Sequence, residues 1–248
     1  MRLIVNSLLF STMVLILMAT SLRAQEPELV IHSVDFPPYE IQNPGLDNLR
    51  GFDVEVVIEA FDRVNVEVEV DFLPWKRIVA MARAGTTLAM LSCEKTDSRK
   101  EFIYYSNPIS KATRTYVAAA EYSGKTPYSM EGARGAKILV ISGYAAEDEL
   151  KKANLKYESV THDMTALRIL LNRNYDFFYS SREFVEYTAR GQGIADKFQY
   201  FDTGKQVFFH LCFSKKWPNS KMLRDKFDKG LAEILADGTY DAIHAKYK

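Results

Sequence analysis

Strand-type and helix-type patterns alternate in the chain after its first 28 residues, and this alternation limits the possible folds more than any other feature. Residues 29–34 and 66–72 have strand patterns, and the second alternates apolar with acidic residues, as on a sheet with one wet face. Apolar residues recur at helical spacing after Asp53, a candidate N-cap, and again after Trp75. The apolar run at 88–91 indicates a third strand, although its periodicity also fits a buried helix. The order β-α-β-α-β predicts a parallel sheet covered by helices.

A second α/β unit with the same logic follows, and a long strand and a helix complete the chain. We expect strands at 113–120, 137–142, 176–179 and 206–214, a short segment at 157–160, and helices from 145, at 164–171, at 181–190 and from 220 to Gly238. In open α/β sheets ligands bind beyond the carboxyl ends of the strands. Two α/β lobes joined by strands also imply a cleft, where small ligands usually bind.

The first 24 residues have the layout of a secretory signal peptide. Arg2 precedes a largely apolar run at 3–18, and Ala24 is a small residue just before a polar stretch. An uncleaved membrane anchor is the alternative, but the run is short for a membrane span and polar residues interrupt it. We therefore expect residues 1–24 to be removed and the protein to be exported.

Charge and cysteine content narrow the function further. Lys plus Arg and Asp plus Glu number 32 each, so there is no basic excess of the kind that nucleic-acid binding requires. Export would permit a disulfide between Cys93 and Cys212, and two buried free thiols fit equally well. The four histidines show no metal-ligand spacing, and we expect neither a metal nor a cofactor.

Residues 87–108, which end in an aromatic-to-turn passage, hold the most site-like sequence. Their apolar start turns polar at Ser92-Cys93-Glu94, and Thr96-Asp97-Ser98 then offers a helix start whose backbone N–H groups favour an anion. Arg99, one turn into that helix, can donate two parallel hydrogen bonds to a carboxylate. The alternative is an ordinary strand-to-helix junction with Arg99 on a solvated face.

A series of short motifs in a fixed order resembles the family-3 extracellular solute-binding proteins, the periplasmic receptors for polar amino acids that feed ABC importers. The motifs are Phe36-Pro-Pro-Tyr39-Glu40, Gly51-Phe-Asp-Val-Glu55, Pro74-Trp75, Thr96-x-x-Arg99, Tyr105-Ser-Asn-Pro108 and Ala236-Asp-Gly-Thr-Tyr240. The resemblance implies a two-lobe, type II periplasmic-binding-protein fold, in which each lobe is a mostly parallel sheet with flanking helices. Lobe 1 would comprise residues 26–112 and 208–248, lobe 2 residues 113–207, and the lobes would close about a two-strand hinge.

The resemblance also implies roles for residues of the first lobe. In amino-acid-binding members the arginine of Thr-x-x-Arg holds the ligand's α-carboxylate, a role that falls to Arg99. The aromatic residue of Pro-Pro-Tyr stacks on the ligand, which implicates Tyr39. Ser92 and Glu94 would line the same face of the cleft, and Trp75 would form a second wall.

The second lobe departs from the pattern of amino-acid receptors at two positions. Where the family has hydroxyl residues at a helix N-terminus, this chain has Gly143-Tyr144-Ala145, so that only the backbone amides remain. Ser181 stands where an aspartate usually holds the α-ammonium. Because an unpaired buried charge is costly, we expect poor discrimination in favour of free α-amino acids. The expected ligand is an anionic or zwitterionic small molecule held by Arg99, with Glu94 pairing Arg99 or reading a ligand cation.

The sequence thus predicts a monomeric periplasmic receptor that captures a small, polar, carboxylate-bearing molecule and delivers it to the membrane permease of an ABC importer. It is not expected to be an enzyme. One alternative is a dehydratase-like enzyme on the same scaffold, with Glu94 or His162 as acid or base. The other is a ligand-sensing protein that docks to a membrane receptor.

Overall fold

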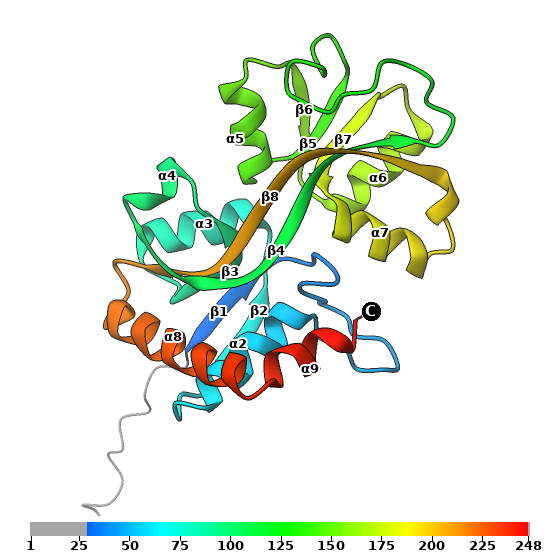
Figure 1. Cartoon of the computed structure of the whole chain (residues 1–248). Helices are drawn as coiled ribbons and strands as arrows, with labels where there is room; N and C mark the ends of the chain where they lie inside the picture. The colour runs from blue at the N-terminus through cyan, green and yellow to red at the C-terminus, as the bar shows by residue number, and fades with distance from the viewer. Residues whose placement is uncertain (1–28, 248) are drawn as a thin grey trace, which may run out of the picture.

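The computed structural model describes residues 29–247, which form a mixed α/β fold of two lobes (Figure 1). The predicted signal peptide, residues 1–24, lies outside the described residues. The strands are β1 Val30–Ser33, β2 Glu69–Phe72, β3 Ala89–Glu94, β4 Ile103–Ala119, β5 Ile138–Ile141, β6 Tyr157–Val160, β7 Phe177–Ser181 and β8 Phe198–Ser214. The helices are α2 Phe52–Asp62, α3 Trp75–Ala84, α4 Asp97–Lys100, α5 Ala145–Lys152, α6 Asp163–Asn172, α7 Arg182–Gly191, α8 Ser220–Ala236 and α9 Thr239–Ala245, with a 3-10 turn, η1, at Ala195–Lys197.

One hydrogen-bonded sheet runs through both lobes, in the strand order β2-β1-β3-β8-β4-β7-β5-β6. At one end β1 pairs in parallel with β2 and β3, and at the other β5 pairs in parallel with β6 and β7. Between these parallel groups lie β8 and β4, which are antiparallel to each other and to their outer neighbours. Each lobe therefore has the parallel core that the sequence predicts, and two long antiparallel strands join them.

The two lobes are defined here by these groups. The first lobe contains β1, β2, β3, α2, α3 and α4 together with α8 and α9, and the second contains β5 to β7 with α5 to α7. In Figure 1, β4 and β8 cross side by side from one group to the other. They pair from Ile103 opposite Ser214 to Ala119 opposite Phe198. Ala112 and Val207, the residues at which we place the lobe boundaries, are partners in this register; the boundaries themselves remain a prediction.

The two ends of the chain come together in the first lobe. Helix α8 packs on α2, and at the contact Gly230 lies so close that an added Cβ would be 1.8 Å from the backbone oxygen of Ala60. A disulfide joins Cys93 of β3 to Cys212 of β8, with the two Cα atoms 6.1 Å apart. Of the two possibilities that the sequence left open, the structure thus has the bonded one.

Two local expectations are wrong, and one helix was not foreseen. The passage Tyr105–Pro108 is not a turn but part of β4, where the register shifts beside Pro108, and proline is tolerated at such irregularities because it donates no ladder hydrogen bond. Asp53 is not the N-cap of α2; Gly51 holds that position, with a φ of 97°, and Asp53 is buried in the first turn. Helix α9, which begins after Gly238, was not expected.

Within residues 29–247, none of the helices has the length and apolar character that a membrane span would need. In the same part of the chain no group of three or more His, Cys, Asp or Glu side chains is arranged to hold a metal ion.

Candidate ligand-binding site

A small cavity lies where the two lobes face each other, beside the strands that join them. Its volume is about 40 Å³, which accommodates a few water molecules and is well below the ~300–1,000 Å³ typical of small-molecule pockets. Six of the seven residues predicted from the sequence line it: Trp75, Ser92, Glu94, Arg99, Tyr144 and Ser181. A ligand the size of an amino acid would therefore need the lobes to separate before it could enter.

The lining residues meet because both lobes direct the carboxyl ends of their parallel strands toward the cavity. In the first lobe, Phe36 follows β1, Trp75 follows β2 and Glu94 ends β3. In the second lobe, Tyr144 follows β5 and Ser181 ends β7. The site is thus at the edge where ligands of parallel α/β sheets bind, and it is built from both lobes.

Arg99 is buried at the contact between the lobes. Its side chain is only 4% exposed, so the alternative of a solvated Arg99 is wrong. Nη1 donates to the backbone oxygen of Glu94 at 3.0 Å, and Nη2 donates to the backbone oxygen of Gly143, in the second lobe, also at 3.0 Å. Burial lowers the pKa of Arg99, while the charge of Glu94 opposes that shift; an arginine remains protonated in either case.

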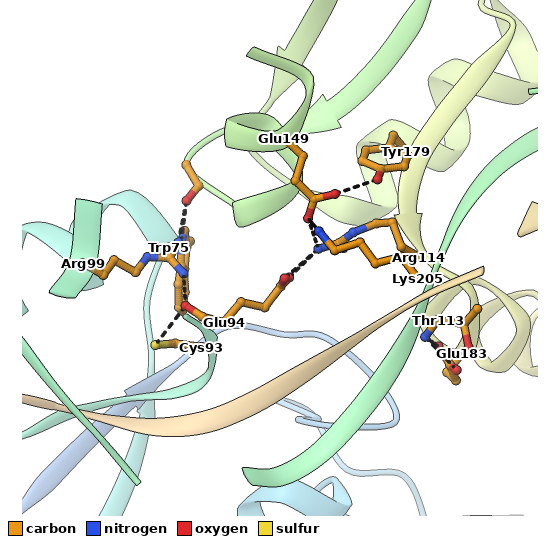
Figure 2. A network of polar contacts seen from close by, with 11 residues as sticks. Trp75, Cys93, Glu94, Arg99, Thr113, Arg114, Glu149, Tyr179, Glu183 and Lys205 are labelled. Carbon is orange, nitrogen blue, oxygen red and sulfur yellow. Dashed lines mark hydrogen bonds and ion pairs between the residues drawn. The ribbon is translucent and has the colours of Figure 1, made fainter. Parts of the chain in front are cut away.

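Trp75 forms a wall of the cavity and also ties the lobes together. Its Nε1 donates to the same Gly143 oxygen at 2.9 Å, and the Arg99 guanidinium lies 5.1 Å from the centre of its ring (Figure 2). Such a cation over an indole ring is attractive and holds the guanidinium in place. The backbone oxygen of Gly143 in the second lobe therefore accepts hydrogen bonds from two side chains of the first lobe, Trp75 and Arg99.

Glu94 does not pair with the Arg99 side chain, contrary to one of the two roles expected for it. Both of its carboxylate oxygens lie 2.7 Å from Nη2 of Arg114, a residue of β4 that the sequence analysis did not single out. The same Nη2 donates to Glu149 of α5 at 3.1 Å. Figure 2 shows Arg114 between the two carboxylates, one from each lobe.

The far side of this ion cluster is completed in the second lobe. Glu149 accepts a hydrogen bond from the Tyr179 hydroxyl at 2.7 Å and pairs with Lys205 at 2.8 Å. Although burial alone would lower the pKa of Arg114, the charges of Glu94 and Glu149 raise it. Burial would raise the pKa of Glu149, but Arg114 and Lys205 lower it overall. Arg114 is therefore a fixed cation, held between carboxylates at the centre of the cleft.

Tyr39 does not line the cavity, unlike the other six candidate residues, and its stacking on a ligand stays a prediction. Its side chain is fully buried and its hydroxyl donates to the backbone oxygen of Lys111 at 3.0 Å. The aromatic residue of this turn that lines the cavity is Phe36, on the other side of the two prolines. A bridge between Phe36 and Glu40 closes this turn, and the Phe36 ring stacks on Phe184 of α7 at 4.7 Å.

Ser92 has a structural partner beneath the cavity. Its backbone is in the left-handed region, with a φ of 46°, and its hydroxyl donates to Oδ2 of Asp53 at 2.6 Å. Ser110 donates to the same oxygen at 2.8 Å. Burial raises the pKa of Asp53 to about 7, although both hydroxyl groups act in the opposite direction. The N-terminal turn of α2 thus places a buried carboxyl group directly behind β3.

In the second lobe, Tyr144 and Ser181 lie at helix N-termini. Tyr144 caps α5, and its hydroxyl donates to Oδ2 of Asp163 at 2.9 Å. The Gly143 amide donates to the Glu147 carboxylate at 2.6 Å, so it is already used within the lobe. Ser181 is 2% exposed and precedes α7. Neither residue contributes a carboxylate to the cavity.

Comparison with known proteins agrees with this architecture. Residues 29–248 match the family of bacterial extracellular solute-binding proteins, family 3. The chain is 22% identical over 213 residues to the L-cystine-binding protein TcyA of Bacillus subtilis (strain 168), covering 86% of this chain and 77% of that protein. It is 23% identical over 226 residues to a probable histidine-binding protein of Neisseria gonorrhoeae, covering 88% and 81%.

Solved structures show the same fold at low sequence identity. The arginine-, lysine-, histidine-binding protein ArtJ of Geobacillus stearothermophilus superimposes with a TM-score of 0.78 at 19% identity, covering 89% of this chain and 94% of that one. A histidine kinase sensor domain similar to periplasmic binding proteins gives a TM-score of 0.79 at 18% identity, covering 89% and 96%. Proteins of this family bind solutes and are not catalysts. With its two lobes, its interlobe cavity and a family match over all the described residues, the chain belongs to the family-3 bacterial extracellular solute-binding proteins.

Proposed function

We propose that this protein is a periplasmic receptor that captures a small, carboxylate-bearing molecule between its lobes and presents it to an ABC importer. Its relatives support the amino-acid-like size of the ligand, since they are named for binding cystine and histidine. A further similar structure, from Streptococcus pneumoniae, is a substrate-binding protein of an ABC uptake transporter with bound histidine. The cleaved signal peptide, the monomeric state and the permease partner are parts of this proposal.

The position of Arg99 carries the proposal. Its guanidinium is buried in the interlobe cavity and has more N–H donors than its two hydrogen bonds to backbone oxygens use. A planar guanidinium matches the two oxygens of a carboxylate. When the lobes part, the bond to Gly143 is lost and further donors of Arg99 become available to a ligand.

Binding of this kind makes and breaks no covalent bond. The ligand would first contact Arg99 and the aromatic walls formed by Phe36 and Trp75 in the first lobe. Closure about β4 and β8 would bring Gly143 and Tyr144 against it, and the closed form would be the one that the permease recognises. No cofactor takes part in these binding steps.

The test is a thermal-shift screen of the mature protein against amino acids, organic acids, amines, short peptides and sugars. A ligand that binds only the native state raises the melting temperature by mass action. We expect carboxylate-bearing compounds to give the shift and to remain intact by NMR. Removing a charged hydrogen-bonding group costs about 1.5–3 kcal/mol, so Arg99→Ala should weaken the binding of such a compound by roughly 10- to 100-fold.

The matched control is Tyr39→Phe, which removes a hydroxyl group that bonds to Lys111 outside the cavity. This variant should lose about 1 kcal/mol of stability but keep its affinity. Equal affinity in Arg99→Ala and the unmodified protein would show that Arg99 is not the carboxylate site. If the protein converted the compound that binds into a product, its function would be that of an enzyme and not of a receptor.

A further inference from the structure

Glu40 places a buried carboxyl group without a hydrogen-bond partner on the wall of the interlobe cavity. It is 1% exposed and lines the cavity. Among the described residues, neither of its carboxylate oxygens has a hydrogen-bond partner. Ser92 and Ser33 lie close enough to act on the pKa of Glu40, but their hydroxyl groups donate elsewhere, Ser92 to Asp53 at 2.6 Å and Ser33 to the backbone oxygen of Val34 at 3.4 Å.

The second carboxyl group that lines the cavity is in a different state. Glu94 is bonded through both oxygens to Arg114, so its charge is neutralised within the protein. Within residues 29–247 Glu40 has no such cation, because the arginines that line the cavity, Arg99 and Arg114, are bonded to other oxygens. A buried polar group that lacks partners is costly, and its cost is offset where a ligand supplies the partner.

The groups around Glu40 are acidic. Burial raises its pKa well above the ordinary value, and Asp53 of α2 and Asp35 of the β1 loop raise it further, while the hydroxyl groups of Ser92 and Ser33 lower it. Glu40 in turn raises the pKa of the phenols Tyr39 and Tyr144. Burial and these acidic neighbours therefore favour the neutral form of Glu40 until a cationic group lies beside it.

We propose that Glu40 is the residue that recognises a protonated nitrogen of the ligand, and that the ligand is a zwitterion with an ammonium, amidinium or guanidinium group as well as a carboxylate. This inference rests on the proposed function, because Arg99 must hold the carboxylate while Glu40 holds the cation. It assigns the cation site to the first lobe, on the turn after β1, rather than to Ser181 in the second. The two ligand charges would then be bound before the lobes close.

Binding would couple to one proton. Glu40 would release its proton to the solvent when the cationic group of the ligand, which keeps its own proton, takes up the position beside it. Affinity should therefore rise with pH up to the pKa of Glu40 in the unliganded protein. Because Asp53 lies next to Glu40 and shares its acidic surroundings, the released proton belongs to this pair of carboxyl groups.

The experiment compares amino acids with the same compounds lacking the amino group. Isothermal titration calorimetry would measure each amino acid beside its desamino carboxylic acid, in two buffers of different ionisation enthalpy. For the unmodified protein we expect tighter binding of the amino compound and release of about one proton below neutral pH. Glu40→Gln resembles the protonated carboxyl group. This variant should weaken the affinity for the amino compound by roughly 10- to 100-fold and leave the affinity for the desamino acid unchanged.

Asp163→Asn is the matched control, since Asp163 is also buried and has an oxygen without a hydrogen-bond partner, but it does not line this cavity. It should change neither affinity nor proton release. Equal binding of both compounds, or the absence of proton release in the unmodified protein, would overturn the role of Glu40 and leave the receptor function standing. If no compound of any class binds, the receptor function fails and this inference fails with it.

Discussion

The contact between α2 and α8 gives the sharpest prediction about how the first lobe is held together. An added Cβ at Gly230 would lie 1.8 Å from the backbone oxygen of Ala60 and 2.8 Å from its carbonyl carbon. An ordinary carbon-to-oxygen approach is about 3.3 Å, so the two helices would have to separate by about 1.5 Å. Since the obstacle is backbone, no side-chain rotation relieves it.

The separation would loosen the core on both sides of the contact. Phe61 and Phe227 pack there with ring centres 5.2 Å apart, and Leu231 is 1% exposed. Overpacking of a well-packed core costs about 1–3 kcal/mol, and the upper end applies because backbone must move. Alanine regains about 1 kcal/mol of helix propensity. Gly230→Ala should therefore destabilise the protein by about 2 kcal/mol net.

Thermal unfolding followed by circular dichroism is the assay. For a chain of this size, a loss of 2 kcal/mol lowers the melting temperature by about 4–8 °C. The matched control is Gly191→Ala in α7, where an added Cβ would have nothing within 4 Å; it should leave stability unchanged or raise it by about 0.5–1 kcal/mol. If Gly230→Ala had the same melting temperature as the control Gly191→Ala, the close approach of α2 and α8 would be refuted.

Two further predictions concern groups that are buried near the cleft. Replacing Cys93 and Cys212 by alanine should lower the free energy of unfolding by about 2–5 kcal/mol, because the disulfide closes a sequence separation of 119 residues. Denaturant unfolding of the unmodified protein with a reductant should show the same loss. A free energy of unfolding that does not respond to the reductant would contradict this prediction. Burial raises the pKa of Asp163 to about 7, so the folded state binds more protons than the unfolded state between about pH 4, the unfolded pKa, and pH 7. Stability should therefore fall as pH rises through that window, by up to about 1.4 kcal/mol per pH unit for this group, and Asp163→Asn should remove that contribution from the slope of melting temperature against pH.

The parallel core of each lobe could be predicted from sequence because its signals are local. Strand β2 shows alternation, α3 has helical spacing that ends at Gly85, and β3 begins with a continuous apolar run. The order of these patterns implies parallel strands, and parallel strands bring their carboxyl ends to one edge. That reasoning accounts for Trp75, Ser92 and Glu94 at this edge, whereas Arg99, Tyr144 and Ser181 were assigned from the resemblance to the family. All six line one cavity.

The cleft chemistry that was missed depends on contacts between distant parts of the chain. Arg114 looks in the sequence like any residue of a strand, since its partners Glu94 and Glu149 lie 20 and 35 positions away. The choice between Phe36 and Tyr39 depends on a bridge across the proline turn, which no periodicity records. Pro108 suggested a turn because proline interrupts most strands, and only the register irregularity in β4 accommodates it.

The return of the chain to the first lobe limits the order in which the two lobes can be completed. The strands β5 to β7 of the second lobe follow one another along the chain, so this lobe has all of its parallel strands once β7 is present. The first lobe must wait for β8 and α8, which supply the partner of β3 and the cover for α2. Cys93 cannot meet Cys212 before then, so the disulfide requires a chain that extends at least to Cys212 of β8. A chain that ends before β8 would lack both the partner strand of β3 and the partner of the Cys93 thiol.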